Sequence, residues 1–99
     1  MMSLGNMTVA FIGSGVMAEA MIKGLLNDKL LPAEQIIAAD PREDRVKELS
    51  TLYGLKGTTD NDAAALSADI LVLSVKPQVL SHVMPEIRRG AHSDRKSVV

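Results

Sequence analysis

The amino-acid sequence predicts an α/β domain: a doubly wound parallel sheet with helices on both faces, in three layers. Short apolar runs of strand length alternate along the 99 residues with longer segments whose apolar residues recur at helical spacing. Strands that alternate with helices favour a parallel sheet with crossover helices. Helices cover both faces of such a sheet, which explains why the predicted strands are almost continuously apolar.

The first predicted unit is a strand, a glycine turn and a helix. Residues 8–12 are apolar, too few for a helix, and end at Gly13, so we interpret them as a buried strand. Apolar residues four positions apart then predict a helix over 16–26. Met17 and Met21 share one face of this helix, and we expect them to fill the core.

The second unit repeats this order. Residues 35–39, which are apolar after Gln35, predict a strand, and the following Pro41 suits the first turn of a helix. Apolar residues at helical spacing continue that helix over 42–53. Gly54 is the expected C-terminal cap, because glycine tolerates the left-handed conformation that ends many helices.

The remaining elements are shorter. Residues 69–75 form the most strand-like segment of the chain, because they are continuously apolar and rich in β-branched side chains. The others are a short strand over 55–57, a helix over 61–67 capped by Thr59 or Asp60, a helix near 79–87, and an apolar run that begins at residue 97.

The turn after the first strand carries the chemistry. Residues 13–18 fit the pattern G-x-G-x-x-A. Gly13 permits a tight turn, Gly15 lets a pyrophosphate approach the backbone, and Ala18 allows close packing of helix on strand. The anion then meets free N–H groups at the helix N-terminus. With a strand before it and a helix after it, the pattern predicts a Rossmann-type dinucleotide site, and the alternative is an ordinary structural turn.

Two residues after the second strand bear on the choice of cofactor. Asp40 stands where an acidic residue holds the adenosine ribose of NAD, although it also suits the cap of a helix starting at Pro41. Arg42 suits the 2′-phosphate of NADP, or it is a solvated helix charge. If Asp40 faces the 2′ position, replacing it with Ser should favour NADPH over NADH.

A second loop, residues 74–77, follows the strand predicted over 69–75. Ligands of open α/β sheets bind beyond the carboxyl ends of the strands, so this loop should face the ribose on the nicotinamide side. Proline makes the loop rigid. Lys76 is either a contact to cofactor or substrate or a solvated side chain.

The composition excludes several functions. The net charge of −1 gives no reason to expect nucleic acid or an anionic membrane, and two aromatic residues are too few for base stacking. Without cysteine there is no disulfide and no thiolate catalysis. No apolar run approaches the ~20 residues of a membrane span, and no secretory signal is evident, so we expect a cytoplasmic protein. His82 and His92 lack the neighbours of a metal or acid–base site. We assign no catalytic or metal-binding residue.

Two segments, residues 11–25 and 73–78, resemble pyrroline-5-carboxylate reductase. An N-terminal G-x-G-x-M-A helix paired with a V-K-P loop separates this family from the related β-hydroxyacid dehydrogenases. The resemblance extends over residues 8–99, which is about the first third of the family's usual length. We expect residues 7–99 to form the NAD(P)-binding domain and treat 1–6 as a leader, of natural or expression origin.

The resemblance implies a reaction and a set of binding residues. Members of the family reduce the cyclic imine 1-pyrroline-5-carboxylate to L-proline with hydride from NADPH or NADH, in proline biosynthesis. By position, Asp40 would lie by the adenosine ribose, and Asn61 would reach the adenosine side or merely neighbour a helix cap. The pyrophosphate loop would comprise Ile12, Gly13, Ser14, Gly15, Val16 and Met17, and the nicotinamide ribose would meet Ser74, Val75, Lys76 and Pro77.

The sequence departs from the family in two ways. Many members carry a hydroxyl residue or Asn-Arg where this chain has Asp40, and a carboxylate there would repel a 2′-phosphate. The C-terminal helical domain of the family, which supplies the dimer contacts and most of the substrate pocket, is absent. From the family's use of NADPH or NADH we expect this chain to bind NADP(H), with NAD(H) as the alternative, and without the helical domain we expect it to be inactive alone. A β-hydroxyacid-type dehydrogenase and a non-catalytic nucleotide-binding module remain alternatives.

Overall fold

The computed structural model describes residues 7–75 together with 97 and 98. Five parallel strands form one sheet in the order β3-β2-β1-β4-β5. This is the predicted doubly wound arrangement. The elements in chain order are β1 (Val9–Ile12), α1 (Val16–Asn27), the 3-10 turn η1 (Ala33–Gln35), β2 (Ile36–Ala39), α2 (Glu43–Tyr53), β3 (Lys56–Thr58), α3 (Asn61–Ser67), β4 (Ile70–Leu73) and β5 (Ser97–Val98).

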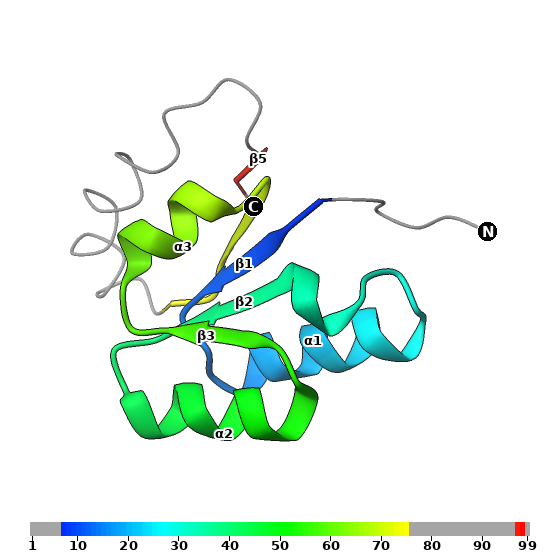
Figure 1. Cartoon of the computed structure of the whole chain (residues 1–99), viewed down its shortest axis with the longest axis horizontal. Coiled ribbons are helices and arrows are strands. Elements are labelled where there is room, and N and C mark those ends of the chain that lie inside the picture. The colour runs from blue at the N-terminus through cyan, green and yellow to red at the C-terminus, as the bar shows by residue number, and fades with distance from the viewer. Residues whose placement is uncertain (1–6, 76–96, 99) are drawn as a thin grey trace.

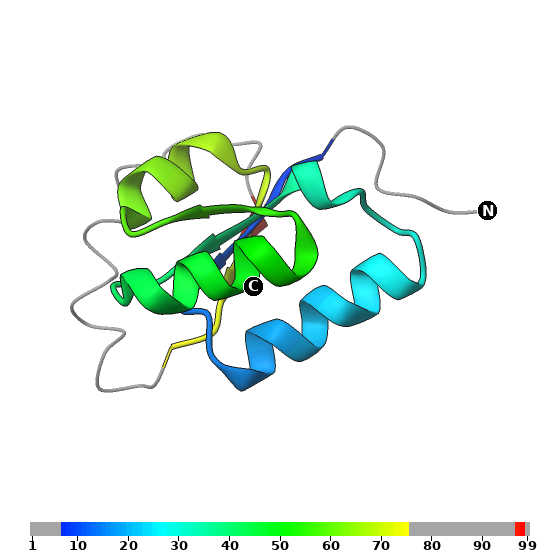
Figure 2. The same cartoon turned by 60° about the horizontal axis from the view of Figure 1, so that its bottom comes forward.

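Three layers are visible in Figures 1 and 2, with α1 and α2 on one face of the sheet and α3 on the other. Successive strand residues point to opposite faces, so each strand feeds two cores. In β1, Val9 and Phe11 pack on the face of α1, whereas Ala10 and Ile12 pack on the face of α3. All four residues of β1 are buried, as expected for the central strand of such a sheet.

The register of β1 determines where the functional edge lies. Ile12 pairs with Ala39 of β2 on one side and with Leu73 of β4 on the other. The chain runs outward from β1 to β3 and then crosses back to β4, so the strand order reverses beside β1. The carboxyl ends of β1, β2 and β4 therefore meet at a topological switch point, where ligands of open α/β sheets bind.

The prediction for the buried face of α1 was wrong. Met17 and Met21 are 76% and 39% exposed, whereas Ala18 and Ile22 are fully buried. Apolar residues recur at every fourth position in two rows of this helix. The row of Ala18 and Ile22 is buried against the sheet, whereas the row of Met17 and Met21 reaches the core only at the half-buried Leu25. Periodicity identifies the helix, but the position of the sheet decides which row is buried.

The start of α2 was also predicted wrongly, because Pro41 and Arg42 lie before the helix. Arg42 is the extended N-cap residue, and α2 begins at Glu43. The Asp40 carboxylate accepts a hydrogen bond from the Arg42 backbone N–H at 2.9 Å, which holds a turn and delays the helix by two residues.

Two predicted helix caps are confirmed. Gly54 ends α2 in the left-handed conformation, with φ +72°, and its N–H binds the Ser50 carbonyl. Asp60 caps α3 by accepting from the N–H groups of Asp62 and Ala63. Among the strands, β3 lies one residue later than predicted and β4 is shorter than 69–75. The helix predicted near 79–87, both histidines and the segment 1–6 lie outside the described residues.

Candidate functional site

Three turns from separate parts of the chain meet at the carboxyl edge of the sheet. The Gly13 N–H donates to the Ala39 carbonyl at 2.9 Å, and the Ser74 N–H donates to the Ile12 carbonyl at 2.8 Å. The Ser14 N–H donates to the Asp40 carboxylate at 2.9 Å. The structure thus brings together the predicted residues that follow β1, β2 and β4. Lys76 and Pro77 lie outside the described residues.

The two glycines of the loop have different roles in the fold. Gly13 has φ +90°, and a Cβ built there would lie 2.6 Å from Val75 Cγ1 and 2.7 Å from the Ser74 carbonyl oxygen. The fold itself therefore requires glycine at this position. A Cβ on Gly15 would meet no atom within 4 Å. The described part of the protein does not require glycine there, and among the described residues that side of the loop is open.

Ser14, between the glycines, is fully buried and bonded within the chain through all its polar groups. Its N–H binds Asp40, its hydroxyl donates to the Ala39 carbonyl at 3.0 Å, and its carbonyl accepts from Arg45 at 2.6 Å. Ser14 therefore shapes the loop through internal contacts. The sequence pattern leaves this position open and carries no signal for such a role.

The loop leads into the first turn of α1, which has no side-chain cap. The first intrahelical bond runs from the Glu19 N–H to the Gly15 carbonyl at 3.0 Å. The N–H groups of Val16, Met17 and Ala18 consequently have no partner within the helix. Val16 and Met17 are largely exposed, so this first turn lies at the surface. Free N–H groups and the helix dipole together make this end of α1 suitable for an anion.

Asp40 is turned inward and engaged on both carboxylate oxygens. Besides the two backbone N–H groups, the Arg42 guanidinium donates to it through Nε at 2.8 Å and Nη2 at 3.0 Å. Burial alone would raise the pKa of Asp40, but the hydrogen bonds from Arg42 and Ser14 outweigh it and lower the pKa to about 2. Arg42 remains 63% exposed in its side chain, so a positive group lies at the surface beyond β2.

Two oxygens near the edge are buried without a hydrogen-bond partner in the described part of the chain. They are Asn61 Oδ1, at the first residue of α3, and Ser74 Oγ, directly after β4. Asp60 rather than Asn61 caps the helix. Buried polar atoms usually have partners, so an unpaired one invites an explanation such as a ligand or a water.

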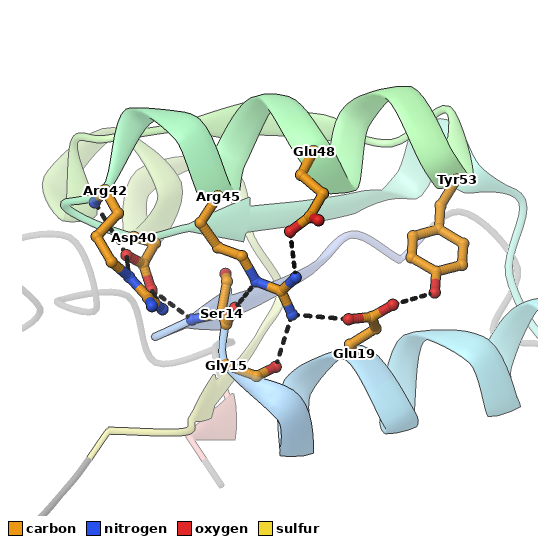
Figure 3. A network of polar contacts seen from close by, with 8 residues as sticks. All are labelled: Ser14, Gly15, Glu19, Asp40, Arg42, Arg45, Glu48 and Tyr53. Atoms are coloured by element: carbon orange, nitrogen blue, oxygen red, sulfur yellow. Dashed lines mark hydrogen bonds and ion pairs between the residues drawn. The ribbon is translucent and has the colours of Figure 1, made fainter.

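Sequence reasoning missed a polar network that joins α2 to the loop (Figure 3). Arg45 donates to the Ser14 carbonyl and to Glu19 of α1, and Glu19 also accepts from the Tyr53 hydroxyl. The pKa of Glu19 is lowered by the hydrogen bonds from Tyr53 and Arg45. In the sequence, Arg45 is one of several charges on a helix, and only the tertiary contacts distinguish it.

The described residues show neither a cluster of three or more metal-ligating side chains nor a helix long and apolar enough to cross a membrane.

The chain is similar to known proteins over a region that includes both the loop and its sheet. A pyrroline-5-carboxylate reductase from Methanosarcina acetivorans is 34% identical over 91% of this chain and 33% of that protein. The one from Vibrio alginolyticus is 44% identical over 76% of this chain and 27% of that protein.

The solved structures agree with these relatives. A pyrroline-5-carboxylate reductase from Coxiella burnetii superposes with a TM-score of 0.79 at 31% identity, over 85% of this chain and 31% of that chain. A pyrroline carboxylate reductase from Plasmodium falciparum shares the fold with a TM-score of 0.75 at 24% identity, over 94% of this chain and 32% of that chain. This chain thus spans about a third of the length of the relatives it matches. A family model described as NADP oxidoreductase coenzyme F420-dependent matches residues 8–99, and the chain belongs to that family.

Proposed function

We propose that this chain is the NAD(P)-binding domain of a pyrroline-5-carboxylate reductase. The observation that carries the proposal is the loop over residues 13–18 at the switch point, followed directly by the uncapped first turn of α1. A pyrophosphate there would meet free N–H groups and the positive end of the helix dipole. The relatives that carry the reductase name support the choice of reaction.

The residues around the loop fit a dinucleotide. Gly15 leaves open space where a pyrophosphate would approach the backbone. Arg42 would meet the adenosine end beyond β2, and Asn61 Oδ1 and Ser74 Oγ would find partners on the adenosine and nicotinamide sides. Ser14 would act through the shape of the loop, since its polar groups are already bonded.

NADP(H) is the cofactor that we propose, with NAD(H) as the alternative. The charge of Asp40 is balanced by Arg42, so Asp40 would repel a 2′-phosphate less than a free carboxylate would. The Arg42 side chain is exposed, and with Nε and Nη2 directed to Asp40 its Nη1 edge is the one that would meet a phosphate. A protein of the same fold, the Plasmodium falciparum reductase, was solved with NADP bound. Binding of NAD(H) by Asp40 would first require the carboxylate to release Arg42.

This geometry changes the expectation for Asp40→Ser. The sequence alone suggested that the substitution would favour NADPH. Because the carboxylate holds both the Ser14 N–H and the Arg42 guanidinium, its removal would loosen the loop and the cation together. Both nucleotides should then bind less tightly.

In the proposed reaction, bound NADPH supplies a hydride to the imine carbon of 1-pyrroline-5-carboxylate, and a proton from solvent completes L-proline. The part of this chain is to bind and orient the dinucleotide through its loop. Hydride transfer also requires the imine to be held in near-attack geometry. The chain covers about a third of its relatives, so we propose that the remainder of the reductase supplies the substrate pocket and the contacts of a homo-oligomer.

Calorimetric titration with NADPH and NADH tests the nucleotide site. Gly15, the N-cap residue of α1, and Gly24, within α1, provide a matched pair of variants. A methyl group at Gly15 or at Gly24 would meet no protein atom within 4 Å. Only the one at Gly15 would lie where we place the pyrophosphate. We expect NADPH to bind more tightly than NADH, Gly15→Ala to weaken binding and Gly24→Ala to leave it unchanged. A folded chain that binds neither nucleotide, or a Gly15→Ala variant that binds as the parent does, would overturn the proposal.

A chimera tests whether this chain can serve as the nucleotide-binding domain of an imine reductase. Residues 8–98 would replace the matching segment of the Methanosarcina acetivorans reductase, and oxidation of NADPH would be followed with 1-pyrroline-5-carboxylate. We expect the chimera to turn over the imine and the isolated chain not to. A chimera that folds but neither binds NADPH nor turns over the imine would contradict the proposal. Turnover by the isolated chain would contradict its proposed inactivity.

A further inference from the structure

The orientation of the peptide group between Ser14 and Gly15 is controlled from α2. Arg45 donates through Nε to the Ser14 carbonyl at 2.6 Å and through Nη2 to the Gly15 carbonyl at 3.3 Å. A trans peptide is planar, so its C=O and N–H point in opposite directions. With the Ser14 carbonyl turned towards Arg45, the Gly15 N–H of the same peptide is turned away from α2. The Gly15 carbonyl also accepts the first intrahelical bond, from the Glu19 N–H at 3.0 Å, so the helix itself orients the next peptide group. Figure 3 shows the guanidinium bridging the two segments.

The same guanidinium is held in place by two carboxylates. Nη2 lies 2.7 Å from Glu19 of α1, and Nη1 lies 2.6 Å from Glu48 of α2. The Arg45 side chain is only 16% exposed. Tyr53 donates to the second oxygen of Glu19, so that carboxylate is itself oriented. The hydrogen bonds that Arg45 donates to Glu19 and Glu48 raise the pKa of Arg45.

The network also accounts for an acidic residue near a proposed anion site. Glu19 lies in the first turn of α1, where its negative charge would oppose a pyrophosphate. Arg45 and Tyr53 both bind that carboxylate and draw it towards α2. The three guanidinium nitrogens of Arg45 together serve four groups, with Nη2 donating to two of them. A lysine ammonium has neither the planar shape nor the reach to replace them.

We propose that Arg45 is a positioning residue for dinucleotide binding, which holds the Ser14 carbonyl against α2 so that the Gly15 N–H faces the pyrophosphate. The inference rests on the proposed nucleotide function. Arg45 itself touches the loop and not the ligand. Its effect should therefore be confined to ligands that carry a pyrophosphate.

The test compares two ligands on the Arg45→Lys variant. NADPH contains the pyrophosphate, whereas adenosine 2′-monophosphate carries the 2′-phosphate end with no phosphate at the 5′ position. Loss of charge-assisted hydrogen bonds to the loop should weaken NADPH about tenfold. Binding of the 2′-monophosphate should change less than about twofold, within the scatter of neutral surface changes. Lys47→Met is the matched control, since Lys47 lies on α2 in an exposed pair with Glu43, 3.7 Å away, and does not contact the loop.

The outcomes separate this inference from the proposed function. If the parent chain binds no NADPH, the proposed function fails. If the parent binds NADPH and Arg45→Lys binds it equally well, or loses both ligands equally, the positioning role is overturned. Should Arg45→Lys not fold, Tyr53→Phe tests the same network by removing only the hydrogen bond to Glu19. It should weaken NADPH selectively, and equal binding or an equal loss of both ligands would contradict the inference.

Discussion

The Asp40 carboxylate should make the free energy of unfolding of this domain depend on pH below about 4, and Asp40→Asn should abolish that contribution. Its pKa is lowered from 3.8 to about 2 by the Arg42 and Ser14 hydrogen bonds, in spite of burial. A carboxyl group with a lowered pKa in the folded state stabilises the fold above its unfolded pKa, and this stability is lost as the pH falls through the folded pKa. For Asp40 it amounts to about 2 kcal/mol at neutral pH, of which about half should be lost at pH 3.

Asp40→Asn keeps the size of the side chain but leaves only one side-chain oxygen that can accept hydrogen bonds. The buried Ser14 N–H and the Arg42 guanidinium then compete for it. A buried donor left without a partner costs about 1–3 kcal/mol, so the substitution should lower the free energy of unfolding by about 2 kcal/mol at pH 7. Because the asparagine does not titrate, the difference between parent and variant should shrink by about half between pH 7 and pH 3.

Urea unfolding followed by circular dichroism at several pH values measures this difference. Asp44→Asn is the control, because Asp44 lies exposed in the first turn of α2. It should change the free energy of unfolding by about 0.5 kcal/mol, as expected for a charge near a helix N-terminus. A parent–variant difference that stays constant from pH 7 to pH 3 would refute the assignment of the acid sensitivity to Asp40.

Two further substitutions, each with a control, test the turns near the site. Gly13→Ala should destabilise the fold by about 3 kcal/mol, because of the positive φ and the contacts below 3 Å with residues that follow β4. Its control, Gly24→Ala, should stabilise the fold by about 0.5–1 kcal/mol. Equal midpoints of urea unfolding for the two variants would refute this contrast. Asp60→Ala should cost about 1 kcal/mol by removing the cap of α3, and Thr59→Ala should cost much less. A thermal melt in which both variants match the parent would show that the cap contributes nothing.

Much of the fold can be predicted from local patterns in the sequence. The apolar strands, the helical periodicity and the caps at Gly54 and Asp60 depend on residues within one or two turns of each other, and the structure confirms them. The G-x-G-x-x-A pattern likewise predicts where the loop lies. The failures concern direction: periodicity could not say that Met17 and Met21 face outward, because only the packed sheet distinguishes the two apolar rows of α1.

The sequence by itself determined the order of strands and helices and the edge at which the predicted site residues meet, since both follow from short-range patterning and the handed crossovers of parallel strands. Only the tertiary structure decided what Asp40 and Arg45 do. Their partners in the loop lie 26 and 31 residues away in the chain, at Ser14. Such contacts depend on how two elements pack, and no local spacing encodes them, because the side chains become neighbours only after the sheet has brought β1 and β2 together.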